Sequence, residues 1–161
     1  MNSNRAVLFL GGFGIGVIAG VRSLTPLAVV SWAVHWGWLD LTGSRLALLG
    51  STAAAVIISL LALAELVVDK LPTTPKRTGP VPLGARAFTG ALSAIVIFTS
   101  ARQSIAAAAI LGGLGGVVGA FAGYEVRHRL VANRRLPDFA VALAEDAVAI
   151  AGGFLLVSHL Y

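Results

Sequence analysis

The chain has 161 residues, of which 57% are hydrophobic and only 12% are charged. Soluble domains carry about 25% charged residues, so this chain has too few charges to cover a water-facing surface. The composition therefore excludes most soluble classes and predicts a single domain embedded in a lipid bilayer.

The net charge of +5 does not indicate a nucleic-acid partner. The lysines and arginines flank apolar stretches, as juxtamembrane charges do, and they form no basic face with interleaved aromatic side chains. Because the sequence contains no cysteine, disulfides, thiolate metal sites and cysteine nucleophiles are excluded. The sequence also has no metal-ligand spacing, phosphate-binding loop or catalytic triad order, so we expect no cofactor and no enzymatic activity.

Six apolar stretches predict an all-α, polytopic membrane protein with about six transmembrane or re-entrant segments in one domain over residues 1–161. The segments are about 6–21, 24–39, 45–70, 84–101, 104–126 and 138–160. A span needs about 20 apolar residues, and about 17 is near the lower limit. The third, fifth and sixth segments are long enough. The first, second and fourth either cross a thinned bilayer or re-enter as hairpins buried in protein.

The start of the chain resembles a signal peptide, because Arg5 precedes an apolar run, but we expect this segment to be retained as a membrane helix. Residues 22–26 break the first apolar stretch, and residues 40–44 end the second. Prolines at positions 72, 75, 80 and 82 predict an extended, non-helical connection over 71–83. Residues 133–137 separate the last two segments.

The distribution of lysine and arginine predicts the orientation of the chain. If the six segments cross or return in pairs, one side receives only Arg5, Arg45 and Arg102. The other side receives nine cations: Arg22, Lys70, Lys76, Arg77, Arg86, Arg127, Arg129, Arg134 and Arg135. By the positive-inside rule the nine-cation side is cytoplasmic, which places both termini in the periplasm.

Two stretches share three residue types in register and suggest two weak parallel repeats. Residues 20–26 and 84–90 each begin with glycine, continue with arginine two positions later and reach threonine five positions after the glycine. Each stretch opens a short apolar segment that is followed by a longer one. Parallel repeats of this kind are related by an axis along the membrane normal.

Glycine recurs every fourth residue in two of the segments. The predicted packing glycines are Gly12, Gly16 and Gly20 in the first segment and Gly115, Gly119 and Gly123 in the fifth. Small residues at this spacing let helix backbones approach closely inside a bilayer. The stripes therefore predict helix contacts, either within one chain or between copies in a homo-oligomer.

Charged residues inside or at the ends of apolar segments are the strongest functional signal. The acids are Glu65, Asp69, Glu145 and Asp146, and the bases at the same level are Arg22, Lys70 and Arg86. Charges at this depth are costly unless they are paired, protonated or hydrated. Two interpretations remain open: an ion-paired clasp that holds short helices together, or a polar pathway for an ion or solute. The charges at 125–129 are more simply a solvated helix end.

Several motifs resemble one bacterial membrane family over nearly the whole chain. They are Gly16-x-x-x-Gly20-x-Arg22-Ser23-x-x-Pro26, Glu65-x-x-x-Asp69-Lys70-Leu71-Pro72-x-x-Pro75-x-Arg77-Thr78, Gly84-x-Arg86, Ala122-Gly123-Tyr124-x-x-Arg127, and Leu136-Pro137-Asp138 through Glu145-Asp146. In these motifs the chain resembles the family known as domain of unknown function 4126. The resemblance implies a small helical protein of the bacterial inner membrane, and it implies no substrate.

The charged layer favours a small transporter or channel for an ion or small solute. The alternative is a non-transporting structural or accessory subunit of a larger membrane complex, which the short chain favours. A dry, fully paired layer in the structure would point to the structural role.

Overall fold

The computed structural model describes residues 3–70, 78–133 and 137–161, and within these ranges every regular element is a helix. The α-helices are α1 (Ser3–Val21), α2 (Thr25–His35), α3 (Thr52–Val68), α4 (Pro80–Ser100), α5 (Ile105–His128) and α6 (Asp138–Ser158). A 3-10 helix, η1 (Arg45–Gly50), precedes α3, and a π-helical turn, η2 (Arg129–Asn133), continues α5. The all-helical prediction is therefore confirmed.

Three of the helices are long and apolar enough to cross a membrane. They are α4, α6 and the continuous stretch Ile105–Ala132 formed by α5 and most of η2. Helices α1 and α3 are apolar but shorter, and α2 has only 11 residues. These lengths and compositions are those of a helical membrane protein.

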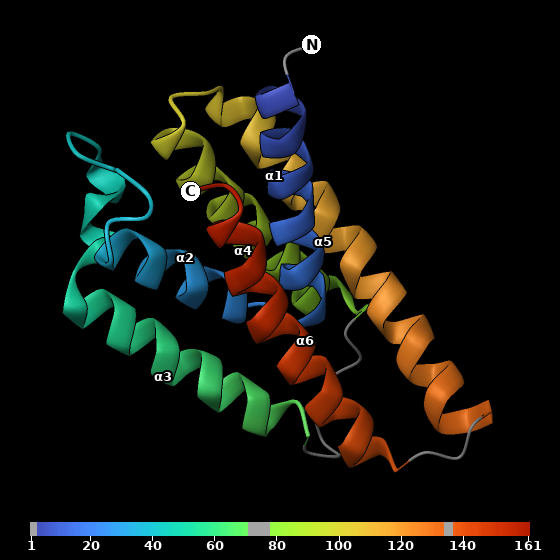
Figure 1. The fold of residues 1–161 in the computed structure, drawn as a ribbon. Coiled ribbons are helices and arrows are strands. Elements are labelled where there is room, and N and C mark those ends of the chain that lie inside the picture. Colours follow the sequence, from blue (N-terminus) through green and yellow to red (C-terminus); the bar gives the residue numbers. More distant parts are fainter. Residues whose placement is uncertain (1–2, 71–77, 134–136) are drawn as a thin grey trace.

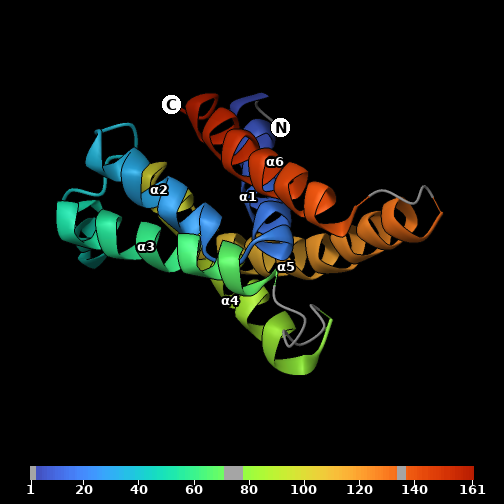
Figure 2. The ribbon, with the colours of Figure 1, turned by 90° about the horizontal axis from the view of Figure 1, so that it is seen from below.

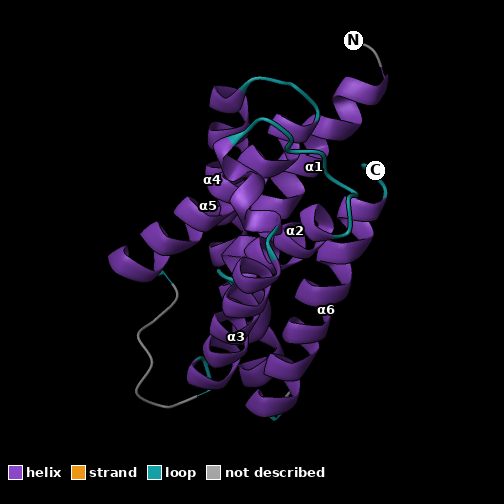
Figure 3. Ribbon diagram, turned by 90° about the vertical axis from the view of Figure 1, so that its left-hand side faces the viewer, coloured by secondary structure: helices purple, strands orange, loops and turns teal. Residues whose placement is uncertain are grey.

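Helices α1, α4 and α5 pack closely against one another and form the centre of the molecule. Helix α6 lies against α1 and α2, while α3 packs mainly on α2 at the side of the molecule (Figures 1 and 2). Both termini lie at one end. The other end is formed by the last turns of α1, α3 and α5 and the first turns of α4 and α6. Figure 3 shows that the regular elements are all helices.

Glycines set the close approach of the central helices. A Cβ atom added to Gly16 of α1 would lie 2.3 Å from the Gly112 carbonyl oxygen of α5, and one added to Gly112 would lie 2.2 Å from the Gly90 oxygen of α4. One added to Gly119 would lie 2.1 Å from the Val17 oxygen of α1. No side chain fits at these positions, so the three backbones touch directly.

The other predicted packing glycines also face neighbouring helices or the interior. An added Cβ would lie 2.4 Å from the Ala120 amide nitrogen at Gly20, and 2.3 Å from the Phe13 carbonyl oxygen at Gly115. At Gly12 it would meet the Phe98 ring at 2.6 Å, and Gly123 is buried on α5. These contacts are all made within one chain.

The ends of several helices follow from local sequence signals. Ser51 and Ser104 each accept a hydrogen bond from a backbone amide in the first turn of α3 and α5, as N-cap serines do. At the other end, Gly37 follows α2 with φ +76°, a left-handed conformation that lets the Trp38 amide donate to the Ala33 carbonyl at 2.8 Å.

Three predicted boundaries are corrected by the structure. Residues 80–83 belong to α4 rather than to an extended connection, because Pro80 and Pro82 lie in the first turn, where an amide hydrogen is not needed. The predicted segment 45–70 divides at Ser51 into η1 and α3, and the predicted segment 24–39 stops at His35. Residues 71–77 and 134–136 of the predicted connections lie outside the described residues.

Candidate functional site: a charged cluster at the end of the bundle

The break between α1 and α2 creates the framework of the site. The helical hydrogen bonding of α1 ends with the Arg22 amide donating to Ile18 at 2.9 Å, and Pro26 in the first turn of α2 has no amide hydrogen to continue the pattern. The interruption frees the amides of Ser23 and Leu24 and the carbonyls of Gly20 and Val21. Buried backbone groups of this kind require other partners.

Two charged side chains satisfy these freed groups. The Glu65 carboxylate of α3 accepts from the Ser23 amide and the Leu24 amide, each at 2.8 Å, and also from the Ser23 hydroxyl. The Arg86 guanidinium of α4 donates to the carbonyls of Gly20 and Val21, each at 2.9 Å. Glu65 therefore satisfies the freed amides at the break, and Arg86 satisfies the freed carbonyls.

Arg22 lies at the centre of the site, with a side chain that is 0% exposed. Its Nε donates to Asp146 at 2.6 Å and its Nη1 to Asp69 at 2.5 Å. Its Nη2 lies 3.4 Å from the Ala142 carbonyl oxygen and 3.5 Å from the Glu145 carboxylate. All three nitrogens of the guanidinium thus face acceptors on α6 or at the end of α3.

Asp69 and Asp146 each bind two cations. The same Asp69 oxygen that binds Arg22 lies 3.6 Å from the Arg86 guanidinium. Asp146 accepts from Arg22 on one oxygen and from the Lys70 amine on the other, each at 2.6 Å. Lys70 also donates to the Leu66 carbonyl at 2.7 Å, which holds its amine over the end of α3.

The structure brings together all seven residues predicted from the sequence and shows which of them pair. Glu65 binds the backbone amides at the helix break, Glu145 lies 3.5 Å from Arg22, and Asp69 and Asp146 make the short bonds to Arg22. Glu65 and Asp69 lie one turn apart at the end of α3, and Glu145 and Asp146 are consecutive on α6, so the rotation of each helix selects which acid binds Arg22.

Arg127 is a member of the site that sequence reasoning missed. Its guanidinium binds Asp138 at 2.7 Å and reaches Glu145 at 3.4 Å, with a side chain that is 18% exposed. The prediction of a solvated helix end at residues 125–129 fits Glu125 and Arg129, whose exposed side chains form an ion pair at 2.6 Å. The sequence feature that could have identified Arg127 is Asp138, the first residue of α6. Because α6 runs back from the end of α5, Asp138 lies beside the end of α5, within reach of Arg127.

We use the name charged cluster for Arg22, Glu65, Asp69, Lys70, Arg86, Arg127, Glu145 and Asp146. It contains four acids and four bases, drawn from α3, α4, α5 and α6 and from the residues that directly follow α1 and α3. Such a balance offsets part of the cost of removing each charge from water. Among the described residues, no group of three or more His, Cys, Asp or Glu side chains is arranged to hold a metal ion.

The fold is that of a helical protein with apolar helices long enough to cross a membrane, as in membrane proteins, and with a buried, ion-paired centre near one end of its bundle. Residues 9–159 match the family model described as "Domain of unknown function (DUF4126)", and the chain belongs to that family, as the sequence motifs predicted. No curated protein and no solved structure matches the chain.

Proposed function

We propose that the charged cluster is an ion-paired clasp, and that the protein is a non-transporting structural or accessory subunit of a larger complex in the bacterial inner membrane. The observation that carries this proposal is the complete burial of Arg22 between Asp69 and Asp146. A guanidinium held by several acids at once has no nitrogen left for a passing solute, whereas it joins α1, α3 and α6 firmly.

Transport of an ion or small solute is the second candidate, and the periphery of the cluster favours it. The side chains of Lys70, Arg127, Asp69 and Glu145 are between 11% and 19% exposed, so the outer part of the cluster is accessible from the molecular surface. A helix interrupted at a charged site is also typical of membrane transporters. In this alternative the outer charges exchange partners while Arg22 stays fixed.

The orientation of the protein in the membrane is part of the proposal. The cluster and the exposed Arg129 lie at one end of the molecule, and that end is assigned to the cytoplasm by the positive-inside rule. Both termini then lie in the periplasm. In this orientation the contacting rings of Trp36 and Trp32 and of Trp38 and Tyr161 lie toward the periplasmic side, where an interfacial belt of tryptophan and tyrosine would be expected, as at either interface.

Two finer features of the fold also remain proposals. We retain six membrane segments in which α2 and α3 cross or return as a pair, and a homo-oligomer is one form that the complex can take. The parallel repeat is supported by the common target of Arg22 and Arg86, which both reach Asp69. The two arginines differ in context, since Arg22 follows α1 and Arg86 lies within α4.

A double-mutant cycle tests the clasp. Arg22→Gln leaves Asp146 with Lys70 alone, and Asp146→Asn leaves Arg22 with Asp69 and Glu145, so each removes one partner from a buried charge and should destabilise the protein by up to about 3–5 kcal/mol. The double variant should regain part of this loss, which thermal unfolding in detergent measures. The exposed pair Glu125 and Arg129 is the matched control, where coupling should not exceed about 0.5 kcal/mol.

Reconstitution separates the two candidate functions. An accessory subunit should carry no ion flux in liposomes and should crosslink in native membranes to proteins other than itself. Flux through the purified wild type that disappears in the folded double variant would establish transport instead. A chain that crosslinks to no other protein in its native membrane would exclude the accessory role.

A further inference from the structure

A surface pocket lies where the first turns of α1 meet the turn after α4 and the residues that follow α6. Its volume is about 520 Å³, and it is at the end of the molecule that carries both termini (Figure 1). We call it the Arg5 pocket. One part of its wall is polar and another is apolar, the polar side chains being Arg5, Gln103, His159 and Tyr161, and the apolar ones including Val7, Leu8 and Leu160.

Close packing holds the three segments of the wall together. A Cβ atom added to Gly11 of α1 would lie 2.6 Å from the Leu160 side chain, so the end of α6 rests directly on α1. The rings of Phe9 and Phe98 meet edge to face with centroids 5.4 Å apart, which joins α1 to the end of α4. The Arg5 pocket is therefore formed by the fold itself.

The Arg5 guanidinium has no acidic side chain to pair with. Of the seven acids in the sequence only Asp40 lies at this end, since the other six lie at the ends of α3 and α5 or in the first half of α6. Asp40 already accepts from the hydroxyl and the amide of Thr42. No described residue forms an ion pair or a hydrogen bond with the Arg5 side chain. An anion that enters the pocket therefore meets a positive charge without a counter-charge.

Two further side chains of the wall have hydrogen-bonding atoms left for a ligand. Nδ1 of His159 lies 2.7 Å from the Leu155 carbonyl oxygen, a contact that places a proton on Nδ1 and leaves Nε2 without a partner among the described residues. Gln103 follows the left-handed turn at Arg102, where φ is 53°, and its side chain bonds to no described residue. The amide of glutamine donates to anions, and so does imidazole when both of its nitrogens are protonated.

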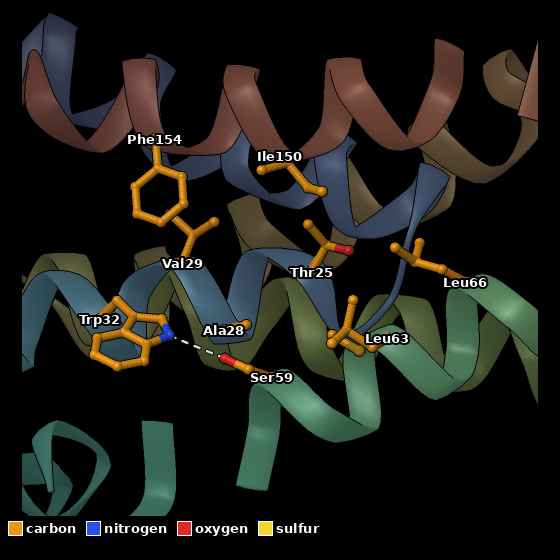
Figure 4. A pocket seen from close by; sticks show the side chains of 10 residues that line it. Thr25, Ala28, Val29, Trp32, Ser59, Leu63, Leu66, Ile150 and Phe154 are labelled. Atoms are coloured by element: carbon orange, nitrogen blue, oxygen red, sulfur yellow. Dashed lines mark hydrogen bonds between the residues drawn. The ribbon is translucent and has the colours of Figure 1, made fainter. Parts of the chain in front are cut away.

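The apolar pocket between α2, α3 and α6 lacks such groups. Its Trp32 indole already donates to the Ser59 hydroxyl at 2.9 Å (Figure 4). No charged side chain is found among the described residues that line it. That pocket offers no counter-charge to an anion, whereas the Arg5 pocket does.

We propose that the Arg5 pocket binds the phosphate of an anionic membrane phospholipid, with Arg5 as the main ligand and Gln103 and His159 as further donors. A guanidinium binds phosphate oxygens through charge-assisted hydrogen bonds, which are stronger than neutral ones. The end of the molecule also has an excess of positive charge, with Arg5, Arg45 and Arg102 against Asp40. This excess favours a lipid with a net negative charge over a zwitterionic one.

The apolar wall favours a lipid over a soluble phosphate compound. Val7 and Leu10 lie one turn apart on α1 and are 49% and 71% exposed, so they continue the apolar surface from the pocket along the helix. Leu10 is about 7.5 Å beyond Arg5 at 1.5 Å per residue. A phospholipid presents its phosphate and its acyl chains in the same order. The stacked rings of Tyr161 and Trp38 are also typical of the membrane interface, where lipid phosphates lie.

Native mass spectrometry of the full chain in a non-ionic detergent tests the site. Titration with phosphatidylglycerol should show one saturable bound lipid per chain. Phosphatidylcholine with the same acyl chains should bind about 5-fold more weakly or worse, because its ammonium group brings a cation toward the arginines. Inorganic phosphate and glycerol 3-phosphate, the soluble probes, should not displace the bound phosphatidylglycerol at millimolar concentration.

Substitutions at arginine make the result specific. Arg5→Gln should weaken phosphatidylglycerol binding by about 5-fold or more, the effect of one arginine close to an anionic lipid, and Arg5→Lys should retain most of the affinity. The matched control is Arg45→Gln, which removes the same charge from an exposed position at the same end but outside the Arg5 pocket. It should change the affinity by less than about 2-fold, because exposed charges are screened at a distance.

A second pair of variants tests the pocket itself. Ala101→Phe places a ring in the wall and should abolish saturable binding, whereas Ala106→Phe, in the first turn of α5 and outside the wall, should not. Both alanines are exposed, so neither variant adds bulk to the interior.

Three results would overturn the proposal. Equal loss of affinity in the Arg5→Gln and Arg45→Gln proteins would show that general surface charge, and not a site, attracts the lipid. Equal binding to the Ala101→Phe and Ala106→Phe proteins would show that the lipid binds elsewhere. Displacement of phosphatidylglycerol by inorganic phosphate or glycerol 3-phosphate would assign the pocket to a soluble phosphate compound.

Discussion

At the scale of single residues, Arg102 occupies a backbone conformation that glycine favours. It follows α4 with φ 53°, while its amide donates to Thr99 and the Gln103 amide donates to Phe98. The same arrangement ends α2, where the corresponding residue is Gly37. A side chain in this left-handed region costs about 1–2 kcal/mol, a cost that arginine bears and glycine does not.

Arg102→Gly should therefore be more stable than Arg102→Ala by about 1 kcal/mol. Both variants remove the same charged side chain, so their difference isolates the backbone term. Thermal unfolding of the two proteins in one detergent measures it. In the reverse experiment Gly37→Ala should lose a similar amount, and equal stability of the two Arg102 variants would contradict the argument.

Asp40, in the loop after α2 and outside the membrane-spanning segments, has a lowered pKa. The main cause is the hydrogen bond from the Thr42 hydroxyl, followed by that from the Thr42 amide at 2.9 Å. Thr42→Val should raise the pKa of Asp40 toward its ordinary value, which an NMR titration of the carboxyl carbon would follow. Because the folded pKa is depressed, the stabilising effect is present above the unfolded pKa and is lost as the pH falls through the folded value. An unchanged titration in the variant would contradict this assignment.

The sequence predicts which residues converge more reliably than which atoms bond. Charges in apolar segments are costly, so the convergence of Arg22, Asp69 and Asp146 follows from their depth alone. The choice of Asp146 over Glu145 as the short contact depends on a rotation of α6 that no local pattern specifies. Arg127 was missed for a related reason, since its partner Asp138 belongs to another helix.

At the scale of the helices, α5 packs so closely on α1 that no atom can be added there, whereas its contact with α4 at Gly113 leaves room for a methyl group. At Gly119 a Cβ would lie 2.1 Å from a backbone oxygen of α1, which cannot yield without moving the helix. At Gly113 the nearest atom is the Ala87 oxygen at 3.7 Å, an ordinary contact. An added Cβ atom therefore cannot fit at Gly119, whereas it fits at Gly113.

Alanine substitutions at these two glycines should change the stability of the protein in opposite directions. Gly113→Ala should stabilise the protein by up to about 1 kcal/mol, the gain in helix propensity. Gly119→Ala should destabilise it, because α1 and α5 must separate to admit the methyl group. Melting temperatures of the two proteins, measured together, test this, and a stabilising Gly119→Ala would show that the contact with α1 is looser than described.

Some helix boundaries can be predicted from the local sequence, and others cannot. The break at residues 22–24 follows from Pro26 and from the polar residues before it. The start of α4 does not, because a proline inside a first turn and a proline in an extended connection give the same local sequence signal. The division of 45–70 at Ser51 is equally ambiguous, since a serine between apolar residues is compatible with both an N-cap and a helix interior.

At the scale of the whole molecule, the two ends differ in chemistry. One end carries the charged cluster, and the other carries both termini together with the loops after α2 and α4 (Figure 1). The Asp40 amide donates to the Ser100 hydroxyl at 2.9 Å, which ties the loop after α2 to the last residue of α4. This polarity is the basis for assigning an orientation in the membrane.

Single-cysteine labelling tests the orientation, since the chain has no cysteine of its own. A cysteine replacing Thr78 should be protected from a membrane-impermeant reagent in intact cells, and one replacing Tyr161 should react. Permeabilised cells should label both, which controls for accessibility. Reaction of the residue-78 cysteine in intact cells would reverse the assigned topology.

The separation in sequence between Arg22 and its partners has a consequence for synthesis. Asp69 follows Arg22 by 47 residues and Asp146 follows it by 124. At about 5–20 residues per second, the ribosome adds Asp146 about 6–25 s after Arg22. During that interval Asp69 is available, but the Nε and Nη2 atoms of Arg22 have no α6 acceptor to bind, so the guanidinium must remain near water at the membrane surface. The cluster can therefore close only when the last helix enters the bilayer, and a chain truncated before α6 leaves Arg22 only partly neutralised, a state that quality-control proteases can recognise.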